Sequence, residues 1–294
     1  MDVIDSIEGL RKVRKAITGS VGLVPTMGAL HAGHIALVRQ AKAENDHVIV
    51  TIFVNPTQFA QNEDLSKYPR DIPRDLDMLR QAGVDLVFTP TADQIYPAGF
   101  QTWIEVEHVS QGLEGERRPG HFRGVATVVA KLFNLTQPDR AYFGQKDAQQ
   151  VAVIKQMVRD LNFSMRIRIC PTVREADGLA MSSRNVYLSE QQRRSASIIR
   201  QALEAASVVY EKGERDPIAI RVVIEDVLKR EPLAQVDYVS IADAVSLQEL
   251  DTASKQPMLV SLVVRMGTTR LLDNMLLPNE LNDIDGLTRI LGGG

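Results

Sequence analysis

Apolar runs and helical patterns alternate along the first part of the chain. Strand-like apolar runs lie at residues 21–24, 47–54, 84–88, 140–143 and 165–170. Apolar side chains recur at helical spacing over residues 5–17, 33–45, 73–83, 123–136 and 151–161. The run at 47–54 is nearly continuous, which is typical of a strand buried on both faces of a sheet. This alternation predicts an α/β fold with a doubly wound parallel sheet.

The pattern changes after residue 184. Two helical patterns, over 189–211 and 217–230, precede strand-like runs at residues 236–241, 258–264 and 269–272. We therefore expect a catalytic domain over residues 1–184 and a smaller α+β domain over residues 185–294. The segment from Asn282 ends in three glycines and is expected to be a flexible tail. Residues 91–122 are irregular, with one strand-like alternation at 102–106.

Polar turns at the carboxyl ends of the expected strands carry the candidate chemistry. The turn at residues 25–34 contains a proline, two glycines, His31 and His34, and it leads into a helix. Free amides at a helix N-terminus favour an anion. An ordinary turn with incidental histidines is the alternative. Ligands of doubly wound sheets bind outside the carboxyl ends of the strands, so we expect the turns at 25–34, 55–59 and 144–147 to converge.

Composition excludes several classes of protein. The 294 residues include 34 Lys and Arg against 37 Asp and Glu, a net charge of −3, which argues against a nucleic-acid or anionic-membrane binder. The one cysteine, Cys170, predicts a buried thiol and excludes an internal disulfide. A secretory leader and a long apolar span are not apparent, so we expect a cytoplasmic protein.

Six ordered motifs resemble those of the pantoate–β-alanine ligase family. They lie at residues 25–34, 55–59, 68–70, 121–125, 143–150 and 174–185, and residues 267–274 look like the family's C-terminal signature. The His-x-Gly-His element alone is weak, because other nucleotidyl-transferring enzymes share it. The six motifs in order are specific.

The resemblance implies a Rossmann-like nucleotidyltransferase sheet and a two-step ligation. ATP and Mg²⁺ would convert pantoate to a pantoyl adenylate and pyrophosphate, and β-alanine would then displace AMP to give pantothenate. The smaller domain would close over the site. The family also implies a homodimer acting on small molecules.

The resemblance carries specific roles to matching residues. The nucleotide-binding set would be Met27, Gly28, Ala29, Leu30, His31, Ala32, Gly33, His34, Gly144, Gln145, Lys146, Asp147, Val173, Met181, Ser182, Ser183 and Arg184. Within it, the catalytic set would be His34 as proton donor, His31 as its positioning partner, and Lys146, Ser182, Ser183 and Arg184 at the phosphates. Pantoate would be held by Gln58 and Gln150, with Asn55 and Tyr68 as weaker candidates.

Several of these residues also have a structural explanation that involves no ligand. Lys146 taken alone is a solvated lysine, Asp147 a helix cap, and residues 182–184 a linker into a helix. Asp75 is a candidate carboxylate on the Mg²⁺ side. Arg74 stands where some relatives appear to have a second acid, so we expect no protein metal site and a Mg²⁺ ion that travels with ATP.

Two further questions stay open from the sequence. His121 and Arg123 either line the pantoate pocket or only pack the loop. The rival functions are a related nucleotidyltransferase with a phosphate acceptor and a non-catalytic nucleotide-binding module. Neutral amides such as Gln58 and Gln150 suit a carboxylate-bearing polyol better than a phosphate.

Overall fold

The computed structural model describes residues 1–60, 63 and 65–292. The chain forms two compact units. The first comprises Met1–Phe143 and Gln149–Cys170, and the second comprises Gly144–Ala148 and Pro171–Gly294. The short segment Gly144–Ala148 thus belongs with the C-terminal residues, and the expected boundary at 184/185 falls inside the second unit.

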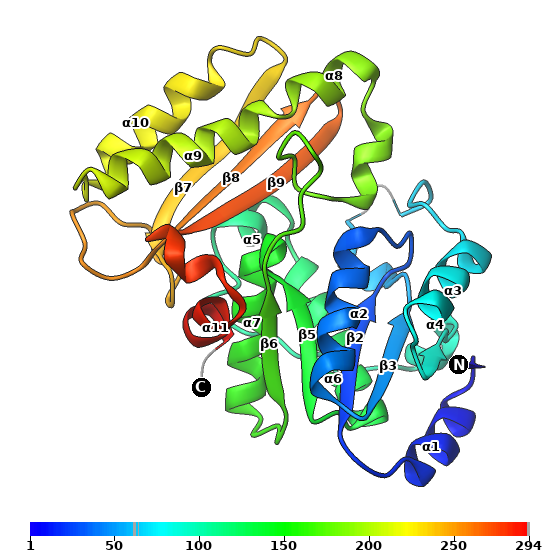
Figure 1. Cartoon of the computed structure of the whole chain (residues 1–294). Helices are drawn as coiled ribbons and strands as arrows, with labels where there is room; N and C mark the ends of the chain where they lie inside the picture. Colours follow the sequence, from blue (N-terminus) through cyan, green and yellow to red (C-terminus); the bar gives the residue numbers. More distant parts are fainter. Residues whose placement is uncertain (61–62, 64, 293–294) are drawn as a thin grey trace. The chain divides into compact units, whose positions relative to one another are not determined.

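A six-stranded parallel sheet organises the first unit, which confirms the predicted fold class (Figure 1). Its strands are β1 (Asp2–Ile4), β2 (Val21–Thr26), β3 (His47–Ile52), β4 (Leu86–Phe88), β5 (Arg140–Gly144) and β6 (Arg166–Cys170), in the spatial order β1-β4-β3-β2-β5-β6. The order reverses between β2 and β5, the switch point at which such sheets bind ligands. β2 and β3 pair over six residues, so the turns that follow them leave the same edge.

Helices connect these strands. They are α1 (Ile7–Ala16), α2 (Ala32–Glu44), α3 (Ile72–Gln81), α4 (Ala92–Ile95), α5 (Leu113–Arg117), α6 (His121–Thr136) and α7 (Ala148–Asp160), with a 3₁₀ turn η1 (Pro56–Gln58). Local signals place their starts: the side chains of Ser6 and Asp71 cap α1 and α3, and Pro73 lies in the first turn of α3.

Two local expectations for this unit differ from the structure. The alternation at 102–106 predicts a strand, but the segment is irregular, and the Ile104 N–H donates to Thr127 Oγ1 at 3.0 Å instead of to a neighbouring strand. Conversely, the sequence pattern does not predict β1. This strand is three residues long, pairs with β4 and is largely exposed, so it lacks an apolar run.

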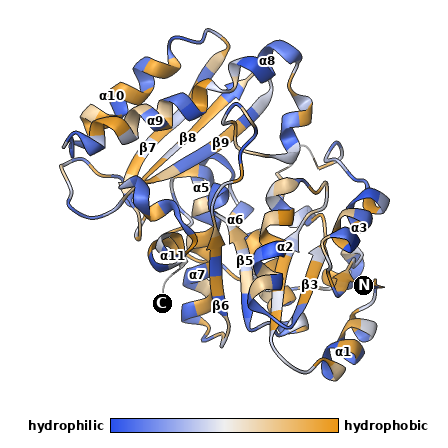
Figure 2. Ribbon diagram, viewed as in Figure 1, coloured by the Kyte–Doolittle hydropathy of each residue, from blue (hydrophilic) through white to orange (hydrophobic). Residues whose placement is uncertain are grey.

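The core of the first unit confirms the interpretation of the strand at 47–54. Val48, Ile49 and Val50 are fully buried, and Figure 2 shows β3 as largely hydrophobic. Cys170 lies in the same core, where burial raises the pKa of its thiol to about 12. A thiol in this environment is inert.

The second unit is built on an antiparallel sheet. Its strands are β7 (Ala234–Asp243), β8 (Met258–Met266) and β9 (Thr269–Leu277), in that spatial order. The helices α8 (Glu190–Ser195), α9 (Ile198–Glu211) and α10 (Pro217–Leu228) precede it, and α9 and α10 share one hydrophobic core with the sheet. The single helical pattern at 189–211 is thus two helices.

The C-terminal segment is folded rather than flexible over most of its length. A 3₁₀ turn η4 (Asn279–Asn282), the helix α11 (Ile284–Leu287) and the short π-helix η5 (Thr288–Gly292) follow β9. Leu287 and Leu291 are buried there, so the expected tail is wrong up to residue 291. The last two glycines lie outside the described residues. In the described part of the chain, no helix combines the length and apolar character needed to cross a membrane.

Candidate functional site

A buried carboxylate fixes the backbone conformation of the turn that follows β2. Gly28 and Ala29 both have positive φ, at 80° and 50°. The backbone amides of Ala29 and Leu30 donate to the two oxygens of Asp75, each at 2.8 Å, and Asp75 is fully buried on α3. A Cβ on Gly28 would lie 3.0 Å from Asp75 Oδ2, so the glycine is needed for this approach.

This geometry corrects the suggested role of Asp75. Both of its oxygens accept backbone hydrogen bonds, so Asp75 anchors the turn and is not a carboxylate presented to Mg²⁺. Burial raises the pKa of Asp75, and the two amide donors act against that rise. Across the described ranges, no group of three or more His, Cys, Asp or Glu side chains is arranged to hold a metal ion.

The two histidines form a capping box at the start of α2. His31 is the N-cap residue, and its Nδ1 accepts from the Gly33 N–H at 3.1 Å. His34 Nδ1 accepts from the His31 N–H at 3.3 Å, and the ring centroids are 4.2 Å apart. Because both Nδ1 atoms accept, a neutral ring carries its proton on Nε2. Each Nε2–H is therefore a donor at a helix N-terminus, which suits an anion.

The turn after β3 contacts the turn after β2. Gln58 Nε2 donates to Met27 Sδ at 3.1 Å, and Asn55 Nδ2 donates to Gln58 Oε1 at 3.0 Å. Asn55 Oδ1 accepts from the hydroxyl groups of Thr57 and Tyr96. Both Asn55 and Gln58 are buried. The turns at 25–34 and 55–59 thus converge as expected.

The start of α6 fixes this second turn. His121 Nδ1 lies 2.9 Å from the Gln58 carbonyl oxygen, and Arg118 donates to His121 Nε2 at 3.1 Å, so the His121 proton sits on Nδ1. Burial, together with the Arg118 charge, lowers the pKa of His121 to about 4. A Cβ on Gly124 would lie 2.5 Å from the Thr57 carbonyl oxygen, so α6 approaches the turn closely.

The structure shows packing contacts for His121 and Arg123, and a role for either residue at pantoate stays untested. His121 packs and orients the turn, and the Arg123 guanidinium lies 4.5 Å from the centre of the Trp103 ring. Arg118, which forms an ion pair with Glu63 at 2.6 Å, is absent from the candidates that the sequence suggests. The only sequence feature that could have pointed to Arg118 is its position three residues before His121.

The remaining substrate candidates differ in their surroundings. Tyr68 is buried, with its ring edge-on to Phe59 at 5.8 Å between centroids. Gln150 lies partly buried on α7. Its neighbour Gln149 is buried and holds the backbone of the 109–114 loop, with Oε1 accepting from the Glu114 N–H at 2.9 Å. The roles of Tyr68 and Gln150 stay predictions.

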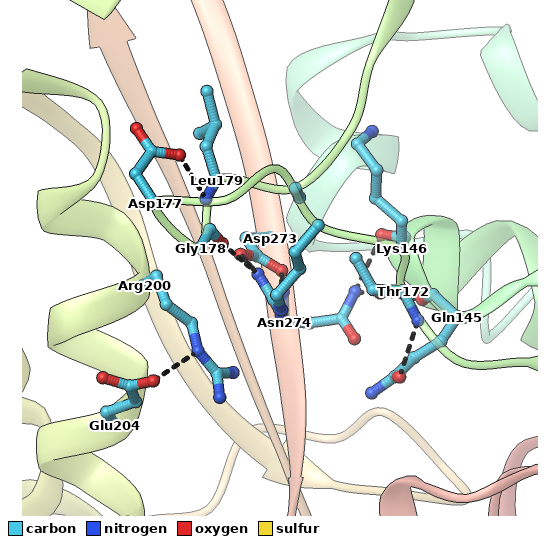
Figure 3. A network of polar contacts seen from close by, with 12 residues as sticks. Gln145, Lys146, Thr172, Asp177, Gly178, Leu179, Arg200, Glu204, Asp273 and Asn274 are labelled. Carbon is cyan, nitrogen blue, oxygen red and sulfur yellow. Dashed lines mark hydrogen bonds and ion pairs between the residues drawn. The ribbon is translucent and has the colours of Figure 1, made fainter. Parts of the chain in front are cut away.

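The second unit carries the other candidates. Lys146 lies on the 3₁₀ turn η2 (Gln145–Asp147), which follows Gly144, and its Nζ lies 3.6 Å from Asp147 Oδ1. Asn274 of β9 donates to the backbone carbonyls of Gln145 and Lys146 (Figure 3).

The loop after β6 contains a narrow β-bridge. Arg174 and Ala180 are bridge partners, and the Met181 N–H donates to the Val173 carbonyl at 3.0 Å. Val173 and Met181, the two expected adenine contacts, therefore lie opposite each other. Ser182 caps the following turn η3 (Ser183–Tyr187) through the Arg184 N–H at 3.3 Å. Ser182, Ser183 and Arg184 thus share one helical turn.

The fold and these turns define a class of protein. A parallel sheet has at its switch point a turn with two histidine donors at a helix N-terminus, and a buried Asn–Gln pair adjoins it. This combination is typical of α/β enzymes that bind a nucleotide through its phosphates.

The chain belongs to the pantoate–β-alanine ligase family, whose pattern it matches over residues 2–276. The pantothenate synthetase of Herpetosiphon aurantiacus is 59% identical over 277 residues, which cover 94% of this chain and 100% of the relative. The chain is therefore a ligase, as its motifs indicated.

Solved structures agree with this assignment. Pantothenate synthetase from Thermus thermophilus is 45% identical and has a TM-score of 0.88, with 94% of this chain and 99% of that one covered. Pantoate–β-alanine ligase from Francisella tularensis, solved in complex with β,γ-ATP and β-alanine, is 37% identical with a TM-score of 0.77, covering 94% and 97%.

Proposed function

We propose that the chain joins pantoate and β-alanine in two steps through a pantoyl adenylate. A carboxylate oxygen of pantoate attacks the α-phosphorus of ATP, and pyrophosphate leaves. The amine of β-alanine then attacks the acyl carbon, and AMP leaves with the former carboxylate oxygen. Family membership over residues 2–276 is the observation that carries this reaction, and the turn with His31 and His34 agrees with it.

In the first step, negative charge grows on the phosphate oxygens, so fixed donors lower the barrier. The Nε2–H groups of His31 and His34 are the proposed donors, with His34 transferring the proton. The amides of Met27 to His34 supply the rest of the nucleotide contact. Asp75 preorganises this turn without touching the nucleotide.

The Lys146 turn and the loop after β6 carry the other proposed phosphate ligands. Lys146 supplies a compact positive charge, and Ser182, Ser183 and Arg184 supply two hydroxyl groups and a guanidinium. Gly144, Gln145 and Asp147 complete the nucleotide contact on the Lys146 turn, and Val173 and Met181 flank adenine.

Pantoate presents two hydroxyl groups and a carboxylate, which buried neutral amides can bind without a competing charge. Gln58 and Gln150 are the proposed partners, with Asn55 and Tyr68 beside them. Gln58 Oε1 accepts from Asn55, and Gln58 Nε2 donates one proton to Met27 Sδ. The second Nε2 proton of Gln58 is the one proposed to bind pantoate.

Three further assignments accompany this reaction. Mg²⁺ enters bound to ATP and keeps most of its water, because Asp75 is already engaged. The protein is a cytoplasmic homodimer. Sedimentation at micromolar concentration tests the dimer, and a monomer mass would overturn it.

The test of the function is a mass balance. With pantoate, β-alanine and Mg·ATP, pantothenate, AMP and pyrophosphate form in equal amounts. Pyrophosphate exchange into ATP requires pantoate and not β-alanine. Exchange that instead requires a phosphorylated acceptor favours the related nucleotidyltransferase, and ATP binding without turnover favours a binding module.

A further inference from the structure

A buried polar pair on β9 contacts two loops that the proposed mechanism uses. Asp273 and Asn274 are adjacent, and each is only 1% exposed. Asp and Asn are depleted in strands, and a buried polar side chain costs free energy unless it is hydrogen-bonded. Such a pair in the middle of a strand indicates a local requirement other than strand stability.

Asn274 holds the backbone of the Lys146 turn. Its Nδ2 donates to the Lys146 carbonyl at 2.7 Å and to the Gln145 carbonyl at 3.1 Å, so both amide protons are used. Figure 3 shows this amide aimed at the Lys146 backbone while the Lys146 side chain extends away. The three-residue turn η2 has no side-chain cap of its own, so it depends on such outside support.

The orientation of the Asn274 amide is determined by these two acceptors. With the amide turned over, Oδ1 would face two carbonyl oxygens. As it lies, Oδ1 is buried and has no partner among the residues that the structure describes. The side chain therefore leaves an acceptor unsatisfied while donating twice to the Lys146 turn, which an apolar residue could not do.

Asp273 connects the same strand to the loop before Ser182. Arg174 donates to both oxygens of Asp273, at 2.6 Å and 3.1 Å, and also to the Gly178 carbonyl at 3.0 Å. Asp273 Oδ1 in turn accepts from the Asn274 N–H at 2.8 Å. Paired and buried in this way, the ion pair fixes the geometry of the loop more than it adds stability.

We infer that Asn274 is a positioning residue for Lys146 in the adenylation step, and that Asp273 and Arg174 tie this position to the loop that leads to Ser182. The inference rests on the proposed role of Lys146. Asn274 touches no substrate. It acts by fixing the backbone from which the Lys146 ammonium reaches the phosphates, and small displacements of such a group lower the rate strongly.

The test compares the two half-reactions. Asn274→Ala removes both donors, and Asn274→Asp keeps the size but places an acceptor against two carbonyls. We expect either variant to slow pantoate-dependent pyrophosphate exchange roughly 10- to 100-fold at saturating ATP. Conversion of preformed pantoyl adenylate by β-alanine should change less than about threefold, because that step needs no contact with the triphosphate.

Met275→Ala is the matched control. Met275 is the next residue on β9 and lies in the hydrophobic core, so its truncation destabilises the strand without touching the Lys146 turn. We expect Met275→Ala to unfold at a lower temperature than the wild type but to carry out pyrophosphate exchange at the wild-type rate. Equal losses for Met275→Ala and Asn274→Ala, or equal losses in both half-reactions, overturn the positioning role.

A double variant separates this inference from the function on which it rests. If Asn274 acts through Lys146, then Lys146→Ala with Asn274→Ala is no slower than Lys146→Ala alone. Multiplied losses contradict the inference and leave the role of Lys146 intact. A wild-type exchange rate in Lys146→Ala contradicts the proposed role of Lys146 itself.

Discussion

At the scale of single residues, buried titratable groups shape the site without facing the substrate. Asp75 holds the amides of Ala29 and Leu30, and His121 holds the carbonyl of Gln58. Each partner lies at least 45 residues away, so neither contact is visible in a local sequence pattern. The motifs point to the residues proposed to carry the chemistry, whereas the residues that orient the turns could be found only from the structure.

His121 predicts a pH dependence of stability. Its pKa falls from an ordinary 6.5 to about 4 in the folded chain because burial disfavours the charged ring. Between these values the unfolded chain binds more protons, so stability rises with pH over this window and falls on acidification. Through His121, going from about pH 7 to about pH 4.5 costs roughly 2 kcal/mol.

Chemical denaturation at the two pH values checks this dependence. His121→Asn keeps a donor toward the Gln58 carbonyl and does not titrate. We expect its free energy of unfolding to fall less on acidification than that of the wild type, by roughly 2 kcal/mol. Identical pH dependence in both proteins would contradict a neutral, buried His121.

His34 carries the catalytic prediction at this scale. His34→Ala removes the proposed proton donor to the phosphate, and we expect adenylation to slow by roughly 10²-fold or more with the fold retained. Single-turnover formation of pantoyl adenylate measures this step directly. A wild-type rate removes His34 from the role.

At the scale of elements, the proposed site residues lie where strands end and helices begin. The turn after β2 begins α2 with a histidine N-cap, where Ser, Thr, Asp or Asn would be more usual. The His31 cap uses Nδ1 as an acceptor, so the other ring nitrogen, Nε2, keeps its N–H for another purpose. His31 caps the helix, and its proposed second role is to donate from Nε2 to the phosphate.

His31→Asn separates these two roles. Asparagine caps helices well but lacks the Nε2 donor, so stability should stay within about 0.5 kcal/mol. Adenylation should slow by roughly tenfold. His31→Ala loses the cap as well, at a further cost of about 1 kcal/mol. Thermal unfolding and pyrophosphate exchange measure the two effects, and unchanged exchange in His31→Asn would leave His31 with only its capping role.

The same scale shows what the sequence could and could not predict. The long apolar run at 47–54 identified β3, because a strand buried on both faces must be apolar. Shorter or alternating runs identified β2, β4, β5 and β6. The edge strand β1 has no such run, and residues 102–106 have the alternation but no strand partner. Strand identity there depends on neighbours, which a local pattern does not contain.

At the scale of the whole molecule, the chain alternates between its two units. It leaves the first unit at Gly144, returns at Gln149 and leaves again after Cys170. The Lys146 turn is thus part of the C-terminal unit although it interrupts the parallel sheet domain in sequence. The sequence pattern alone could not predict that this short segment belongs with residues that follow it much later in the chain.

The C-terminal segment is also part of the folded molecule. Leu287 is fully buried although it lies near the end of the chain. Leu287→Ala should lower the free energy of unfolding by roughly 2–4 kcal/mol, because a buried leucine leaves a cavity. Arg289→Ala, at an exposed position nearby, is the control. A loss below about 0.5 kcal/mol for Leu287→Ala would show that this segment does not dock in solution.

The central claim, ligation through an acyl adenylate, is tested most directly by an oxygen label. Pantoate carrying ¹⁸O in both carboxylate positions is turned over with β-alanine and Mg·ATP, and the masses of AMP and pyrophosphate are measured by mass spectrometry. Attack of the carboxylate on the α-phosphorus predicts one ¹⁸O in each AMP and none in pyrophosphate. Unlabelled AMP, or label in inorganic phosphate, would contradict the account.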